Sequence, residues 1–240
     1  MPIEPDPDLD HGDGHSESGH STASITRHAL EFTREVGLDG ITIRALARRA
    51  GVFPTVVYHH VGDLETVRYA VADAVVAAIE IPPPIDDSSE WRSWLSALAE
   101  NGYATLSAYQ GVYPFITRTG PSSPSQLRVI DAAMQVLAGA GLSDRDATFG
   151  YNAFIAHVGA SADTAARFAL HADERPARRA EFERRVRDVA ALHPGLARTI
   201  PFFSEWDHTE GFRVTLELLL DGIERRRVPP SDRAASSTTG

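Results

Sequence analysis

The sequence predicts an all-helical protein built from two parts. Between residues 22 and 227, apolar residues recur at the spacing of amphipathic helices, as at Ile25, Ala29, Phe32 and Val36. No segment shows convincing alternation of apolar and polar residues, and no hairpin dipeptide separates two apolar runs. The 240 residues are long enough for one large domain or for a small domain joined to a medium one. We therefore expect helices packed on helices, without a sheet.

The N-terminal part, residues 22–81, reads as a helix-turn-helix unit followed by a longer helix. Gly37 ends the first helix, and Thr42 can cap a short second helix that ends at Gly51. A third helix of about two turns runs from about Pro54 to His59, and a fourth, capped by Asp63, extends to Glu80. Two short helices separated by a tight glycine turn are the sequence form of a helix-turn-helix.

A run of prolines marks the boundary between the two parts. Pro82, Pro83 and Pro84 cannot continue a helix, so we place the start of the second domain at residue 86 and its end at residue 227. The longer second domain contains five helical stretches, which we expect at Ser89–Tyr109, Pro124–Ala140, Ser143–Leu170, about Pro176–Leu192 and His208–Arg226.

The composition excludes several classes of protein. There is no cysteine, so disulfides, thiolate chemistry and Cys-ligated metals play no part. No apolar run approaches the roughly 18 residues that a membrane span needs, and the N-terminus does not resemble a secretory signal. No glycine-rich phosphate loop or nucleophile–base–acid pattern is present. We expect a cytoplasmic protein with no membrane contact, no catalytic residues, no cofactor and no metal site.

The charge distribution leaves a nucleic-acid partner open despite the net charge of −10. Six acidic residues and no basic residue fall within residues 1–21, a polar segment that we expect to be disordered, as is the C-terminal tail at 228–240. Between Gly40 and Gly62, by contrast, Arg44, Arg48 and Arg49 stand without any acidic residue. A local basic surface is therefore expected on the helix-turn-helix.

The same region carries a family resemblance. The runs Ala29–Phe32, Gly37–Ala47, Ala50–Val52 and Val57–Val61 resemble, without a gap, the DNA-binding domain of the TetR (tetracycline repressor) family. More loosely, Trp91, the run Gly141–Ala147 and the segment Phe212–Gly222 are similar to the C-terminal domains of the tetracycline-repressor-like branch. The resemblance implies a homodimeric, ligand-responsive transcriptional regulator, most often a repressor, that reads a palindromic DNA operator.

Physical chemistry and the resemblance together suggest roles for the exposed residues. Thr42 at a helix N-terminus and the outward-pointing Arg44 suit contacts to phosphates, which position a protein on DNA. The short third helix would enter the major groove and read bases. The resemblance implies that Tyr58 and His60 reach sugar–phosphate oxygens, although Tyr58 could instead pack between helices and the histidines could be chance surface residues. The full set of expected DNA contacts is Thr42, Arg44, Pro54, Thr55, Val56, Tyr58, His59 and His60.

Two residues depart from the family pattern. Phe53 stands where a small capping residue usually begins the recognition helix, and Leu64 stands where a basic residue often opens the fourth helix. The departures favour weaker or more salt-sensitive DNA binding and an apolar reading surface suited to thymine methyl groups.

The second domain is expected to hold an effector pocket. Most of its aromatic residues should be core, but polar residues on apolar helix faces are better candidates for ligand contacts. The expected ligand-binding residues are Trp94, Asn101, Tyr103, Gln110, Tyr113, Asn152, Phe154 and His157. His11, His15 and His20 in the N-terminal tail and the widely spaced His157 and His171 are not expected to share a metal ion.

Two apolar strips suggest how a dimer would form. We expect the strip Gly150, Ala153, Ala156 and Ala160 and the strip Leu216, Leu219, Leu220 and Ile223 to make a four-helix interface between two chains. The leading hypothesis is thus a regulator released from a palindromic operator by a small, mainly apolar effector. One alternative is a small-molecule-binding protein whose DNA-binding head has weakened, and an enzyme with an acquired helix-turn-helix is a distant third.

Overall fold

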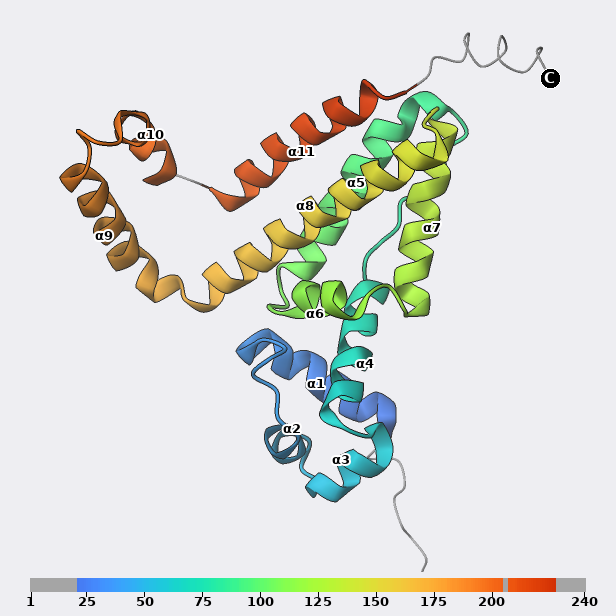
Figure 1. Ribbon diagram of the computed structural model, residues 1–240. Coiled ribbons are helices and arrows are strands. Elements are labelled where there is room, and N and C mark those ends of the chain that lie inside the picture. Colours follow the sequence, from blue (N-terminus) through green and yellow to red (C-terminus); the bar gives the residue numbers. More distant parts are fainter. Residues whose placement is uncertain (1–20, 205–206, 228–240) are drawn as a thin grey trace, which may run out of the picture.

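The computed structural model describes residues 21–204 and 207–227, where every regular element is a helix. The expectation of an all-helical fold is confirmed. The expected disordered tails, 1–21 and 228–240, lie outside the described residues apart from Ser21, which caps the first helix. Figure 1 shows a small N-terminal group of helices below a larger C-terminal group. The N-terminal elements are α1 Thr22–Val36, α2 Ile43–Ala50, α3 Pro54–Val61 and α4 Leu64–Ala77.

The C-terminal elements begin after an irregular segment that contains the three prolines. They are the 3₁₀ helix Ser88–Glu90, α5 Trp91–Leu106, α6 Val112–Thr119, α7 Pro124–Gly139, α8 Asp144–Leu170, the 3₁₀ helix Ala172–Glu174, α9 Arg175–Asp188, α10 Pro194–Ser204 and α11 His208–Glu224.

Side-chain caps define where several helices begin. Ser21, Thr42 and Asp63 accept hydrogen bonds from the backbone N–H groups three residues ahead, which fixes the starts of α1, α2 and α4. The turn between α2 and α3 depends on Gly51, whose φ of 71° belongs to the left-handed region that favours glycine. The residues expected to end and begin these helices therefore do so, except that α3 ends at Val61 rather than near His59 and α4 ends at Ala77 rather than at Glu80.

Helix α8 is the central element of the C-terminal domain. It spans 27 residues and packs against α5, α6, α7 and α11. Its inward face buries Tyr151, Phe154 and Val158. In Figure 1, α9 and α10 extend from the end of α8 away from the rest of the molecule, and the two helices pack mainly on each other.

The two parts of the chain are joined in two ways. Helix α4 leaves the N-terminal domain and packs against α5, α6 and α7. In addition, the backbone N–H of Leu38 donates to the carbonyl oxygen of Gln110 at 2.8 Å, which joins the α1–α2 turn to the α5–α6 turn. The neighbouring Gly111 N–H donates to the buried carboxylate of Asp163 on α8, also at 2.8 Å. The N-terminal helices are therefore connected to α8 through both a helix and a pair of turns.

Candidate nucleic-acid interface and ligand cavity

A small apolar core holds α3 at a fixed angle to α2. Leu46, Val57 and Val61 are buried between α1, α2 and α4. The backbone N–H of Val52 donates to the Ala47 carbonyl at 2.9 Å, which closes the turn after Gly51. Because these contacts fix the turn and the inward face of α3, the opposite face of α3 is presented to solvent as a rigid surface.

The N-terminus of α2 offers hydrogen-bond donors beside a free cation. The Thr42 oxygen accepts the Ala45 N–H at 3.2 Å, so its hydroxyl proton is still available to donate. Arg44 is exposed and makes no ion pair within the described residues. An uncommitted guanidinium next to a helix N-terminus is suited to bind a phosphate.

Helix α3 presents the expected reading residues outward. Thr55, Tyr58 and His59 are exposed, with 55% of the Tyr58 side chain accessible, while Pro54, Val56 and His60 are half-buried. The exposure of Tyr58 argues against a role in packing between helices. The carbonyl of His60 accepts a hydrogen bond from the Thr22 hydroxyl at 2.9 Å, so the end of α3 is tied to the start of α1.

Four further residues refine the expected surface. Phe53 precedes α3 without making a side-chain cap, and it is 78% exposed, which places an aromatic ring at the edge of the reading surface. Arg48 is exposed without an ion pair in the described part of the chain. Arg49, however, is bound by Glu35 through two hydrogen bonds of 2.7 and 2.8 Å, so its charge is already compensated. Leu64 packs against the core, in keeping with an apolar residue at the start of α4.

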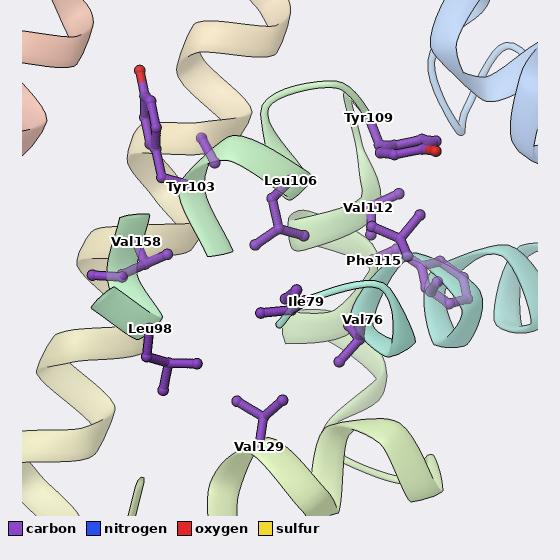
Figure 2. Close-up of a cluster of buried hydrophobic side chains, with 14 of the residues drawn as sticks. Val76, Ile79, Leu98, Tyr103, Leu106, Tyr109, Val112, Phe115, Val129 and Val158 are labelled. Atoms are coloured by element: carbon purple, nitrogen blue, oxygen red, sulfur yellow. The ribbon is translucent and has the colours of Figure 1, made fainter. Parts of the chain in front are cut away.

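A cavity of about 340 Å³ lies between α4, α5, α6, α7 and α8. Figure 2 shows Val76, Ile79, Leu106 and Val129 arranged around this region. Its other lining residues are Tyr113, Ile116, Thr117, Gly120, Pro121, Gln126, Ile130, Tyr151, Asn152, Ile155 and Ala156.

The cavity walls carry few polar groups. Burial, with a smaller contribution from the Tyr113 phenol, raises the pKa of Tyr151 to about 12, and burial also raises the pKa of Tyr113. The Gln126 side-chain oxygen accepts the N–H groups of Ser122 and Ser123 and belongs to a capping box at the start of α7. Asn152, which is exposed, donates to the Thr148 carbonyl on its own helix at 2.8 Å.

A close contact between α6 and α8 positions one cavity residue. The ring of Tyr113 lies against Gly159, where an added Cβ would be only 2.0 Å from the ring atom Cδ2. The absence of a side chain at residue 159 thus allows the Tyr113 ring to lie flat against α8.

Of the eight residues expected to bind ligand, Tyr113 and Asn152 line the cavity and the other six do not. Trp94 and Asn101 instead hold the segment between α4 and α5. The Trp94 indole N–H donates to the carbonyls of Pro82 and Pro83 at 3.2 and 2.8 Å, and the Asn101 amide donates to the Glu80 carbonyl at 2.8 Å. Phe154 is fully buried in the core.

Three of those six residues contact other elements. The rings of His157 and Tyr103 both stack on the ring of Phe212 in α11. The Nε2 atom of His157 also lies 2.9 Å from the backbone carbonyl oxygen of Phe212. Figure 2 shows the Tyr103 hydroxyl directed away from the surrounding apolar side chains. Gln110 contacts the α1–α2 turn through its backbone carbonyl.

The cavity includes residues that the sequence reading missed. Tyr151 and Gln126 were not expected there, although Gln126 could have been found from the spacing Ser-x-x-Gln of a capping box. No signal in the sequence marks Val76 and Ile79, since they look like any core positions of a helix.

The outer face of α8 and α11 forms a second depression. It is lined by Phe149, Ala153 and Leu218 among others, and Phe149 and Leu218 are well exposed. Of the strip expected on α8, Ala153, Ala156 and Ala160 are exposed and Gly150 is buried. Of the strip expected on α11, Leu216, Leu220 and Ile223 are buried within the chain and Leu219 is half-buried. The apolar side chains that α11 exposes are Val214 and Leu218, because they lie on the opposite side of the helix.

No group of three His, Asp or Glu side chains within the described ranges is placed to hold a metal ion. The three tail histidines, His11, His15 and His20, fall outside those ranges. None of the described helices is both long and apolar enough to cross a membrane.

Fold and site together define a helix-turn-helix DNA-binding protein with a separate ligand-binding domain. Residues 83–227 match the sequence-family model of the tetracyclin repressor-like C-terminal domain. The chain therefore belongs to the TetR family of transcriptional regulators. Proteins of this family are regulators rather than enzymes.

Curated relatives span nearly the same length. The tetracycline repressor protein class A from transposon 1721 of Escherichia coli is 31% identical over 210 residues, covering 85% of this chain and 91% of the relative. The class C repressor of Escherichia coli is 27% identical over 210 residues, with coverage of 87% and 93%.

Solved structures share the fold. ActR from Streptomyces coelicolor in complex with actinorhodin superposes with a TM-score of 0.72 at 21% identity, covering 85% of this chain and 96% of that one. A possible TetR family transcriptional regulator from Streptomyces coelicolor A3(2) gives a TM-score of 0.71 at 26% identity, with coverage of 86% and 100%.

Proposed function

We propose that the protein is a cytoplasmic, homodimeric repressor that binds a palindromic DNA operator and is released when a small, mainly apolar molecule fills the cavity. The observation that carries the proposal is that α4 belongs to both sites. Only Gly62 and Asp63 separate its start from α3, the proposed reading helix, and Val76 near its other end lines the cavity.

The DNA side of the proposal assigns two kinds of contact to the residues of α2 and α3. Thr42 and Arg44 would bind phosphates, together with Tyr58 and His60, and Arg48 would add to the positive field. Thr55, Val56, His59 and Pro54 would face bases in the major groove, with Phe53 beside them. Two such helix-turn-helix units, related by a two-fold axis, would bind two operator half-sites that lie one or more turns of the DNA helix apart.

The coupling rests on contacts between α4 and α6. Tyr69 of α4 packs edge-to-face on Phe115 of α6, with ring centroids 5.1 Å apart, and Arg118 lies 3.3 Å from Glu65. Tyr113, Ile116 and Thr117 of the same short helix line the cavity. A ligand that displaces α6 would therefore tilt α4 and change the separation of the two reading helices in a dimer.

The dimer would use the exposed face of α8 and α11. Phe149, Val214 and Leu218 are large, exposed apolar side chains on these two helices. A two-fold arrangement would pack this face on its copy, as a self-complementary four-helix interface.

Leu64 and Phe53 favour the alternative, a ligand-binding protein whose N-terminal domain binds DNA only weakly. Neither residue offers the hydrogen bond that a basic or small polar residue would supply. The free Arg44 and Arg48 and the intact turn at Gly51 favour the repressor.

Selection of bound fragments from genomic DNA by the purified protein tests the proposal. We expect enrichment of an inverted repeat. Arg44→Ala should then weaken binding to all sequences about equally, whereas Thr55→Ala should change which bases are preferred. Failure to enrich any sequence would favour the weakened-head alternative, and an equal change of base preference in both variants would contradict the assigned roles.

A further inference from the structure

The cavity wall carries no ionisable acid or base that is charged at neutral pH. Its lining consists of aliphatic side chains, two tyrosines, one threonine, two amides, a glycine and a proline. A charged ligand would lose its hydration there without gaining an opposite charge, which is strongly unfavourable. A divalent cation would also lack protein ligands, because no carboxylate or imidazole is part of the wall.

The size of the cavity limits the ligand. An apolar cavity of about 150 Å³ accommodates benzene. The volume of about 340 Å³ is more than twice as large, so it suits a molecule of two or three fused or linked rings.

Three hydrogen-bond donors of the cavity lining, on Tyr113, Tyr151 and Gln126, make no hydrogen bond within the described part of the chain, although only 8% of Tyr151 is exposed. The raised pKa values of both phenols keep them protonated at neutral pH. Gln126 uses its side-chain oxygen to cap α7, so the group it can offer to the cavity is its N–H₂.

We propose that the cavity binds an uncharged, metal-free aromatic ligand of two or three rings whose carbonyl or ether oxygen accepts hydrogen bonds from Tyr113, Tyr151 and Gln126. This inference rests on the proposed function, since it names the chemical class of the effector for the same site. A ligand that covers these donors discriminates against analogues that leave them unpaired, so the acceptor oxygen is the specificity determinant.

Three matched probes test the ligand class. These are 2-acetylnaphthalene, which is neutral and carries an acceptor; 2-isopropylnaphthalene, which has the same shape without the acceptor; and 2-naphthoate, which carries a negative charge. Calorimetric titration of the full-length protein at pH 7 and without DNA measures the three affinities. We expect the ketone to bind about fivefold or more tightly than the hydrocarbon, and naphthoate to bind more weakly than the ketone by at least tenfold.

Tyrosine variants locate the binding. Tyr151→Phe should remove most of the preference for the ketone over the hydrocarbon and leave the affinity for the hydrocarbon unchanged. Tyr103→Phe is the matched control, because it removes a phenol that stacks on Phe212 outside the cavity, and it should leave the preference intact. Near-ultraviolet circular dichroism and thermal melting show whether each variant is folded.

Absence of ketone binding at millimolar concentration would overturn the inference. So would naphthoate binding as tightly as the ketone, or a preference for the ketone that persists in a folded Tyr151→Phe variant. A separate titration with operator DNA tests the proposed function. Ketone binding that does not release DNA would contradict the repressor mechanism while leaving the ligand class in place.

Discussion

The contact between Gly159 and Tyr113 gives the sharpest prediction about packing. In Gly159→Ala, the new Cβ would lie 2.0, 2.1 and 2.5 Å from three atoms of the Tyr113 ring. Since ordinary contacts of a Cβ begin at 3.4 Å, the ring has to shift by about 1.4 Å or α6 has to move away from α8.

The size of the effect follows from two opposing contributions. Overpacking of this kind costs about 1–3 kcal/mol, whereas replacing glycine by alanine within a helix stabilises by up to about 1 kcal/mol. Gly139→Ala in α7 is the matched control, because its new Cβ would meet nothing within 4 Å. We expect Gly159→Ala to have a free energy of unfolding about 1–3 kcal/mol below that of Gly139→Ala, and a lower affinity for cavity ligands.

Urea unfolding at one fixed protein concentration measures the difference, since the stability of a dimer depends on concentration. A double variant, Gly159→Ala with Tyr113→Ala, should show coupling, because removal of the ring makes space for the new methyl group. If Gly159→Ala is as stable as Gly139→Ala and its effect adds independently to that of Tyr113→Ala, the assigned contact is refuted.

Three further outcomes are expected. Asp163→Ala should lower the free energy of unfolding by about 1–3 kcal/mol, because it leaves the buried Gly111 N–H without an acceptor. Arg167→Ala, which removes the half-exposed ion-pair partner of Asp163, should lower it by less than about 1 kcal/mol. Equal losses in urea unfolding would refute this role of Asp163. Trp94→Phe keeps the aromatic packing but removes the bond to the Pro83 carbonyl, so faster proteolysis around residues 78–87 is expected, and an unchanged cleavage pattern would argue against it. Hydrogen bonds from Thr66 hold the pKa of Asp63 below its ordinary value of 3.8. The stabilisation by this cap is therefore present above pH 3.8 and is lost as the pH falls through the lowered pKa. The Asp63→Asn variant should lose less stability on acidification than the unmodified protein, and identical pH profiles would contradict this.

Helical periodicity and capping residues predicted most of the helices. Strong side-chain caps at Thr42, Asp63, Ser123 and Ser143 mark the starts of α2, α4, α7 and α8. Helix α6 was missed because it has only eight residues, begins after a left-handed Gly111 without a side-chain cap, and contains Pro114. Helix α10 was also missed; it has eleven residues and contains Pro201, which interrupts a helical pattern.

The expected DNA contacts lie within one continuous segment, residues 42–60, so local pattern was sufficient to propose them together. The cavity combines residues of five successive helices, α4 to α8, and local pattern could not assemble it. Helical geometry alone argues against placing both Asn152 and His157 in the cavity. Asn152 and His157 are five residues apart, which separates them by about 140° around a helix. They cannot face one cavity together, and His157 in fact turns toward α11.

The most direct test of the coupling between cavity and operator is a reciprocal titration. Operator affinity is measured by fluorescence anisotropy at increasing concentrations of the tightest-binding cavity ligand, and ligand affinity is measured with and without saturating operator. We expect ligand to weaken operator binding and operator to weaken ligand binding by the same factor, because two sites that share one conformational equilibrium are linked reciprocally. A ligand that fills the cavity and leaves operator affinity unchanged would contradict the proposal that α4 couples the two sites.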